Sequence, residues 1–196
     1  MEADWEFEVG GDAPVIDALW LGFVDLRWTA QPGCDQASRV RNLSETVQFP
    51  ALGAALEKLN AENSPVWTSK CDFWPALQPE DFDGDELDAP IASTVHAVGC
   101  YIDLLLKGDQ SDQQSTFPEK IASRCKKLCT SLHSVSLRCC RVDLIVRRAQ
   151  MAPDLMDMGI TAYFTACGAT PAEAVRTLEA SLAAFTGALC ARSTVQ

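Results

Sequence analysis

The fold is decided by residues 137–189, in which LRCCRVDLIVRR (137–148) and ITAYFTAC (160–167) precede TPAEAVRTLEASLAAFTGAL (170–189). The first two segments have the character of strands. The third begins with Thr170, which suits a helix cap, then a proline at the first helical position and a glutamate at the third, as in a capping box. Apolar residues then recur at helical spacing. This stretch predicts two strands followed by a helix.

The same order occurs twice upstream. Strand-like segments at 4–9 and 18–28 precede a helix beginning at Pro50, and segments at 66–74 and 94–107 precede one beginning at Pro118. Residues 23–26 (FVDL) also resemble residues 101–104 (YIDL). We therefore predict one α+β domain over residues 1–196, built from three strand-strand-helix units. Its mostly antiparallel sheet of about six strands would carry three helices on one face, in a ferredoxin-like style.

Two of the predicted strands, 18–28 and 94–107, are apolar on both sides. A strand with one face in water should alternate apolar and polar residues, so both faces of the sheet are expected to be covered. The helices can cover one face. The long connections 29–48 and 75–93 could cover the other as lids, or a second subunit could do so. We favour a homodimer.

The charge balance argues against a nucleic-acid partner. The chain has 27 acidic and 16 basic residues and a formal net charge of −11, which a phosphate backbone would repel. Bases concentrate between residues 120 and 148, and acids between 80 and 88. We interpret these as two solvated faces of opposite sign. An anion-binding patch, or a contact between subunits, is the alternative.

Localisation and redox state follow from composition. No apolar run approaches the ~18 residues of a membrane span, and the N-terminus is acidic where a signal peptide would be basic. The nine cysteines cannot all pair within one chain. We expect a soluble cytoplasmic protein with reduced cysteines, most of them in the core.

A cluster of cysteine and histidine is the strongest metal candidate. Cys125, Cys129 and His133 are spaced four apart, so they share one side of a helix, and Cys139 and Cys140 follow. Thiolate and imidazole groups ligate zinc. Adjacent strand residues point to opposite faces, however, and the chain has no paired Cys-x-x-Cys motifs. Core cysteines are therefore the preferred interpretation, metal binding is a weak alternative, and we expect no cofactor.

Aspartates within apolar strands are the most informative polar residues. Asp25 and Asp103 occupy matching places in two of the units. A buried carboxylate is costly unless it is paired, so these residues either mark where a strand leaves the core or are neutralised by a nearby arginine. In a functional interpretation they converge on the open sheet face as acid–base or ligand-anchoring groups, together with Arg27 or His96. A core histidine is the commoner role for His96.

The tryptophans suggest where an apolar ligand could bind. All five lie in the first 74 residues, and Trp20 and Trp28 share a predicted strand face. Candidate ligand contacts are Trp20, Trp28, Arg27, Arg141 and Arg147. The chain has no phosphate-binding loop, dinucleotide fingerprint or nucleophile elbow. The leading hypothesis is a non-catalytic binding or interaction protein. A small enzyme or ligand-binding protein that uses Asp25 and Asp103 is the alternative.

Overall fold

The computed structural model describes residues 1–18, 24–27, 36–91, 95–107 and 118–191. Its sheet has six strands in the order β1-β5-β6-β4-β3, and β2 also pairs with β5. The strands are β1 (Glu2–Glu8), β2 (Ile16–Asp17), β3 (Val66–Trp74), β4 (His96–Leu106), β5 (Cys140–Ala152) and β6 (Leu155–Gly168). Three pairings are antiparallel, namely β3–β4, β4–β6 and β5–β6. The prediction of an α+β fold with a mostly antiparallel sheet is confirmed.

Five α-helices and one short 3-10 helix belong to the described residues: α1 (Gln36–Arg41), α2 (Ser44–Gln48), α3 (Pro50–Leu59), η1 (Pro79–Asp81), α4 (Pro118–His133) and α5 (Pro171–Cys190). The helix starts predicted at Pro50, Pro118 and Pro171 are confirmed. Proline suits the first helical position because the backbone N–H that it lacks would have no partner within the helix. Thr170 caps α5, and its hydroxyl accepts a hydrogen bond of 3.2 Å from the Glu173 N–H. The loop predicted over 29–48 is wrong for residues 36–48, which contain α1 and α2.

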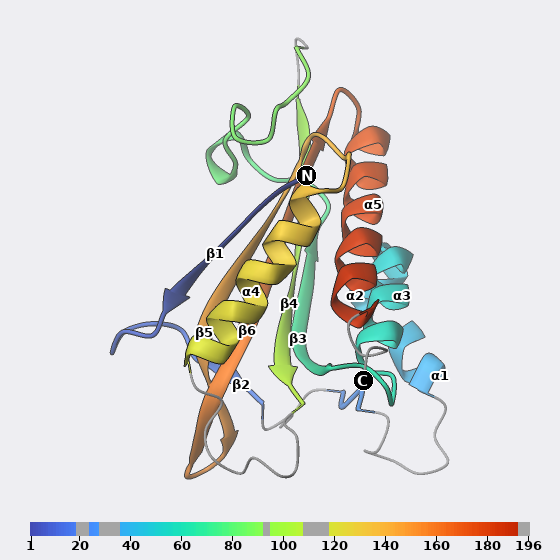
Figure 1. Ribbon diagram of the computed structural model, residues 1–196. Coiled ribbons are helices and arrows are strands. Elements are labelled where there is room, and N and C mark those ends of the chain that lie inside the picture. Colours follow the sequence, from blue (N-terminus) through green and yellow to red (C-terminus); the bar gives the residue numbers. More distant parts are fainter. Residues whose placement is uncertain (19–23, 28–35, 92–94, 108–117, 192–196) are drawn as a thin grey trace.

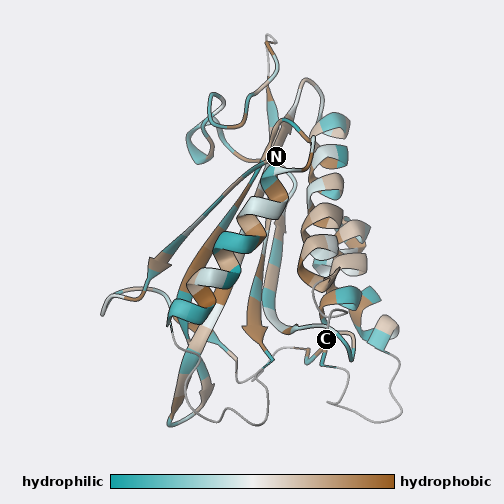
Figure 2. Cartoon of the chain, in the orientation of Figure 1, coloured by the Kyte–Doolittle hydropathy of each residue, from teal (hydrophilic) through white to brown (hydrophobic). Residues whose placement is uncertain are grey.

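The main core lies between one face of the sheet and the helices. Figure 1 shows α4 lying across β5 and β6 with α5 beside it, and α3 packs against α5. Alternate residues of the central strands point to this core, for example Ile102 in β4, Leu144 in β5 and Phe164 in β6, and all three are fully buried. The Phe164 ring meets Phe185 of α5 edge-on at 5.0 Å. Hydrophilic residues recur along the outer side of α4 (Figure 2), as expected for an amphipathic helix.

Segments of the same chain cover both ends of the second sheet face. At one end, Leu87 of the 75–91 segment packs against Ala97 and Cys167. At the other end, Ile16 and Ala18 pack against Leu105 and Ala149. These contacts explain why β4 is apolar on both sides without a second subunit. The homodimer stays a prediction, but the apolar second face no longer requires it.

Segments 4–9 and 18–28 were expected to form neighbouring strands, but the described part of the second segment, residues 18 and 24–27, does not pair with β1. β1 instead runs parallel to β5, with Glu2 opposite Arg141 and Glu8 opposite Arg147. Residues 24–27 are not in a strand. Side chains of α1 bind carbonyl groups of this segment: the Gln36 side-chain amide donates to the Leu26 carbonyl at 2.9 Å, and the Arg39 guanidinium donates to the Asp25 carbonyl. The described residues therefore do not show the three equivalent units of a ferredoxin-like repeat.

Candidate ligand-binding cleft

A cleft of about 250 Å³ lies on the second sheet face. The strand pleat places alternate residues of β4, β5 and β6 on this face, and residues 14–16 close one side. Its lining consists of Pro14, Val15, Ile16, Trp74, Tyr101, Asp103, Arg147, Thr161 and Tyr163. The cleft therefore combines an aromatic floor with a few polar groups, which is the usual make-up of a small-molecule site.

Three aromatic rings form a row across the floor. The ring centroids of Trp74 and Tyr101 are 5.7 Å apart with an interplanar angle of 29°, and those of Tyr101 and Tyr163 are 5.8 Å apart. Tyr101 and Tyr163 are direct partners in the β4–β6 register. Beyond them, the Arg147 guanidinium lies 5.5 Å from the Tyr163 centroid. The row thus spans β3, β4 and β6 and ends on a cation of β5.

The lack of a side chain at Gly99 lets the Trp74 ring pack closely against β4. A Cβ atom at Gly99 would lie 3.1 Å from Trp74 Cε3 and 3.3 Å from Leu77 Cδ1. Both distances are shorter than ordinary van der Waals contact, so a side chain here would push the indole away from β4. The glycine is therefore required by the close approach of Trp74.

The polar groups of the cleft form a connected hydrogen-bond network. The Thr161 hydroxyl donates to Asp103 Oδ1 at 2.7 Å and accepts from Arg147 Nη1 at 3.2 Å. Arg147 Nη1 also donates to the Tyr163 hydroxyl at 3.0 Å. Its Nε and Nη2 both donate to Glu8 Oε2, at 2.8 and 2.6 Å. Glu8 thus neutralises Arg147, while Asp103 has no direct ion-pair partner among the described residues.

Burial changes the acidity of two groups in the cleft. Burial raises the pKa of Asp103 above its ordinary value of 3.8, and the Thr161 hydrogen bond and the Arg147 charge partly offset this rise. Burial, together with the nearby carboxylate of Asp103, raises the pKa of Tyr101 to about 12. Tyr101 therefore stays a neutral phenol at physiological pH. A raised carboxyl pKa in a cleft is a frequent mark of a functional site.

Of the sequence candidates, Asp103 and Arg147 line this cleft. Asp25 does not: it forms an ion pair of 2.6 Å with Arg27, whose guanidinium lies 5.7 Å from the Trp67 ring centroid. His96 is seven residues along β4 from Asp103, which is roughly 23 Å in a strand. The odd number of residues also places the two side chains on opposite faces. The predicted grouping of Asp103 with Asp25, Arg27 or His96 is therefore not formed.

Arg141 and the acidic segment meet within the chain. Arg141 lies 2.7 Å from Asp143 Oδ1 and 3.0 Å from Glu86 Oε2. Arg138 forms a further pair with Asp88 at 2.5 Å. The basic and acidic stretches thus contact each other instead of forming only separate solvated faces. The candidates Trp20 and Trp28 lie outside the described residues.

The residues considered as metal ligands pack in the core or form hydrogen bonds within the chain. Cys125 and Cys129 are buried in the main core. His133 Nε2 accepts a hydrogen bond of 3.3 Å from the Ala3 N–H, which helps to hold β1. The Cys139 thiol donates to the Asp88 carbonyl at 3.3 Å. Within the described ranges, no group of three or more histidine, cysteine or acidic side chains is arranged to hold a metal ion.

Seven of the nine lining residues were missed by sequence reasoning, among them the aromatic and hydroxyl-bearing Trp74, Tyr101, Thr161 and Tyr163. The alternation of residues 101 and 103, and of 161 and 163, was visible in the sequence. The strand register that places Asp103 opposite Thr161 was not visible in the sequence. Strand order and register depend on contacts between distant segments, so the sequence alone could not bring these residues together.

Comparisons with known proteins gave no match to a family model, to a curated protein or to a solved structure. In the part of the chain that the structure describes, no helix has the length and apolar character needed to cross a membrane.

Proposed function

We propose that the protein binds a small organic cation with a planar ring in the cleft on the second sheet face. The observation that carries this proposal is the row of Trp74, Tyr101 and Tyr163 beside a buried carboxylate without a direct cationic partner among the described residues. The ring of the ligand would stack on the aromatic row. Its nitrogen would donate to Asp103 Oδ2, which accepts no hydrogen bond from the described residues.

The charges of the cleft favour a cation over an anion. The lining has one carboxylate, Asp103, and one guanidinium, Arg147, whose charge is neutralised by its ion pair with Glu8. Lys70, the other cation that acts on Asp103, is itself 3.7 Å from Asp17. Aromatic faces attract cations by about 0.5–2 kcal/mol, and more so where water is excluded. The net charge of −11 adds a long-range attraction for cations. A bound cation would also favour the ionised form of Asp103 and so lower its pKa.

Binding explains the cleft better than catalysis does. The alternative of a small enzyme relied on Asp25 and Asp103 converging on the open face with Arg27 or His96, and of these only Asp103 lines the cleft. Arg147 is held by Glu8, Thr161 and Tyr163. Asp103 is the one carboxylate of the described lining, and we assign it to holding the ligand.

Nuclear magnetic resonance with three matched probes tests the proposal. Benzylamine, benzyl alcohol and benzoate share one ring and differ in charge at pH 7. We expect benzylamine to shift the indole N–H signal of Trp74 and the backbone amides of Tyr101 and Thr161, with smaller shifts for the alcohol and none for benzoate. Equal binding of benzoate, or shifts confined to another surface, would refute the proposal.

We infer self-association from a different observation. Leu155 and Met156 at the β5–β6 turn are 57% and 49% exposed, and Val9 after β1 is 43% exposed. Leu155 and Met156 are consecutive residues, and exposed apolar groups that lie together are typical of contact surfaces. Size-exclusion chromatography with light scattering should give twice the chain mass of 21.3 kDa. A monomer at all accessible concentrations would exclude the homodimer and leave the cleft proposal intact.

A further inference from the structure

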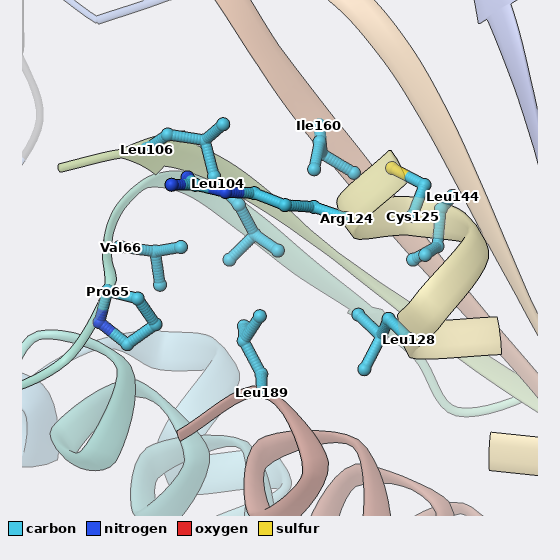
Figure 3. Close-up of a pocket in the computed structure, with 10 residues that line it drawn as sticks. All are labelled: Pro65, Val66, Leu104, Leu106, Arg124, Cys125, Leu128, Leu144, Ile160 and Leu189. Atoms are coloured by element: carbon cyan, nitrogen blue, oxygen red, sulfur yellow. The ribbon is translucent and has the colours of Figure 1, made fainter. Parts of the chain in front are cut away.

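A second cavity lies on the other side of the sheet, between the sheet and helices α4 and α5. Its volume is about 220 Å³. The lining, shown in Figure 3, consists of Pro65, Val66, Leu104, Leu106, Arg124, Cys125, Leu128, Leu144, Ile160 and Leu189. All of these residues except Arg124 are apolar or, in the case of Cys125, carry a neutral thiol. An apolar space of this size weakens the packing around it unless something fills it.

Arg124 is the one charged residue of the described lining. In Figure 3 its side chain extends from α4 toward Leu104 and Leu106 of β4, and its nitrogen atoms lie at that end of the cavity. No described carboxylate forms an ion pair with it. The cavity therefore has an apolar interior and a single guanidinium at one end.

We propose that this cavity holds an unbranched acyl chain whose terminal carboxylate pairs with Arg124. A planar guanidinium matches a carboxylate through two parallel hydrogen bonds. A phosphate dianion would require a second cation, and the described lining contains one. The volume lies below the ~300–1,000 Å³ of drug-sized pockets, so the site fits a short or medium chain. This site is independent of the cleft, because it lies on the opposite sheet face.

The thiol of Cys125 takes no covalent part in this binding. Burial raises its pKa to about 12, so it is protonated at physiological pH. A protonated thiol is a weak nucleophile and packs as a small apolar group. The ligand is therefore held by apolar contact along the chain and by charge at its head.

Calorimetric titration of the full chain with decanoate and decanol, both below their aggregation limits, tests the site. The two probes share one chain and differ in the head group. Because Arg124 is exposed, its ion pair with the head group is screened by water, and we expect decanoate to bind more tightly than decanol by up to about fivefold. Equal affinity, or no binding of either probe, would overturn the proposal.

Three variants assign the binding to this cavity. Arg124→Gln should remove the preference for decanoate while decanol binding stays unchanged. Lys126→Gln removes the same charge from the same helix outside the lining, and should leave the preference intact. Leu189→Trp should fill the cavity and abolish binding of both probes, with a melting temperature equal to or above that of the wild type. A preference that survives Arg124→Gln, or is lost equally in Lys126→Gln, would show that the general charge of α4 binds the probe.

Discussion

The Thr161 hydroxyl donates a hydrogen bond of 2.7 Å to Asp103 Oδ1, from the position directly opposite it in the β4–β6 register. This contact joins the buried carboxylate to the network that continues through Arg147 to Glu8. Asp103 is only 7% exposed, yet it forms no direct ion pair with a described residue. A buried carboxylate without an ion pair lowers the free energy of unfolding, and its presence in a cleft supports a binding role.

Replacement of Asp103 by asparagine should stabilise the protein at neutral pH. Burial raises the pKa of Asp103 in the folded state, so ionisation costs stability as the pH rises from 3.8 through the folded value. The amide of Asp103→Asn would keep an oxygen acceptor for Thr161 and remove that cost. Melting curves at pH 7 should show a gain on the order of 1 kcal/mol, which is about 2–4 °C. The gain should vanish near pH 4; a loss of stability at pH 7 would contradict this account.

Arg147 should contribute more to stability than the exposed Arg138. The Arg147 side chain is 13% exposed and donates to Glu8, Thr161 and Tyr163. We expect Arg147→Ala to cost about 2–3 kcal/mol in the free energy of unfolding, since several charge-assisted hydrogen bonds are lost. Arg138→Ala breaks a surface pair and should cost below about 1 kcal/mol. Urea denaturation measures both values, and equal effects would argue against the network.

Alanine at Gly99 and at Gly187 should have opposite effects. At Gly99 the added methyl group would meet Trp74 and Leu77, so we expect a loss of about 1–3 kcal/mol and an altered near-ultraviolet circular dichroism spectrum. At Gly187, within α5, nothing described lies within 4 Å of the added atom. Alanine there should stabilise the helix by about 0.5–1 kcal/mol. Gly99→Ala with wild-type stability would show that Trp74 does not pack on β4 as described.

Most of the described cysteines should be unreactive in the folded protein. Burial raises the pKa of Cys71, Cys125 and Cys167 to about 12, and of Cys129 and Cys140 to about 11. At pH 8 the thiolate fraction of each is then roughly one in a thousand or less. An aromatic disulfide reagent should modify these thiols only after addition of urea. Rapid modification in native buffer would mean that they are accessible.

Much of the fold could be predicted, because its signals are local. The three helix starts depend on proline and capping residues within four positions. The antiparallel pairs β3–β4 and β5–β6 each join strands that were predicted as consecutive segments of the chain. The place of β1 could not be predicted, since its parallel partner β5 is more than a hundred residues away. Its position is fixed by distant contacts, including the hydrogen bond from the Met1 amine to the Val135 carbonyl.

The candidate site was predictable only in part for the same reason. Asp103 was identified because a carboxylate within an apolar strand is costly wherever the strand lies. The analogy between Asp25 and Asp103 was wrong, because a local feature, the nearby Arg27, neutralises Asp25 outside any strand. The aromatic row depends on strand order, which brings residues 74, 101 and 163 together. No local pattern in the sequence encodes that order.

Calorimetric titration of benzylamine at pH 7 into the wild type, Asp103→Asn and Asp143→Asn tests the central claim most directly. Asp143 is a suitable control because it lies on the same sheet face, is half-buried and does not line the cleft. We predict that Asp103→Asn weakens binding about tenfold or more, the usual effect of removing one charge from a charge-assisted hydrogen bond. Asp143→Asn should bind as the wild type does. Wild-type affinity in Asp103→Asn, or an equal loss in both variants, would contradict the assignment of the cleft as a cation-binding site.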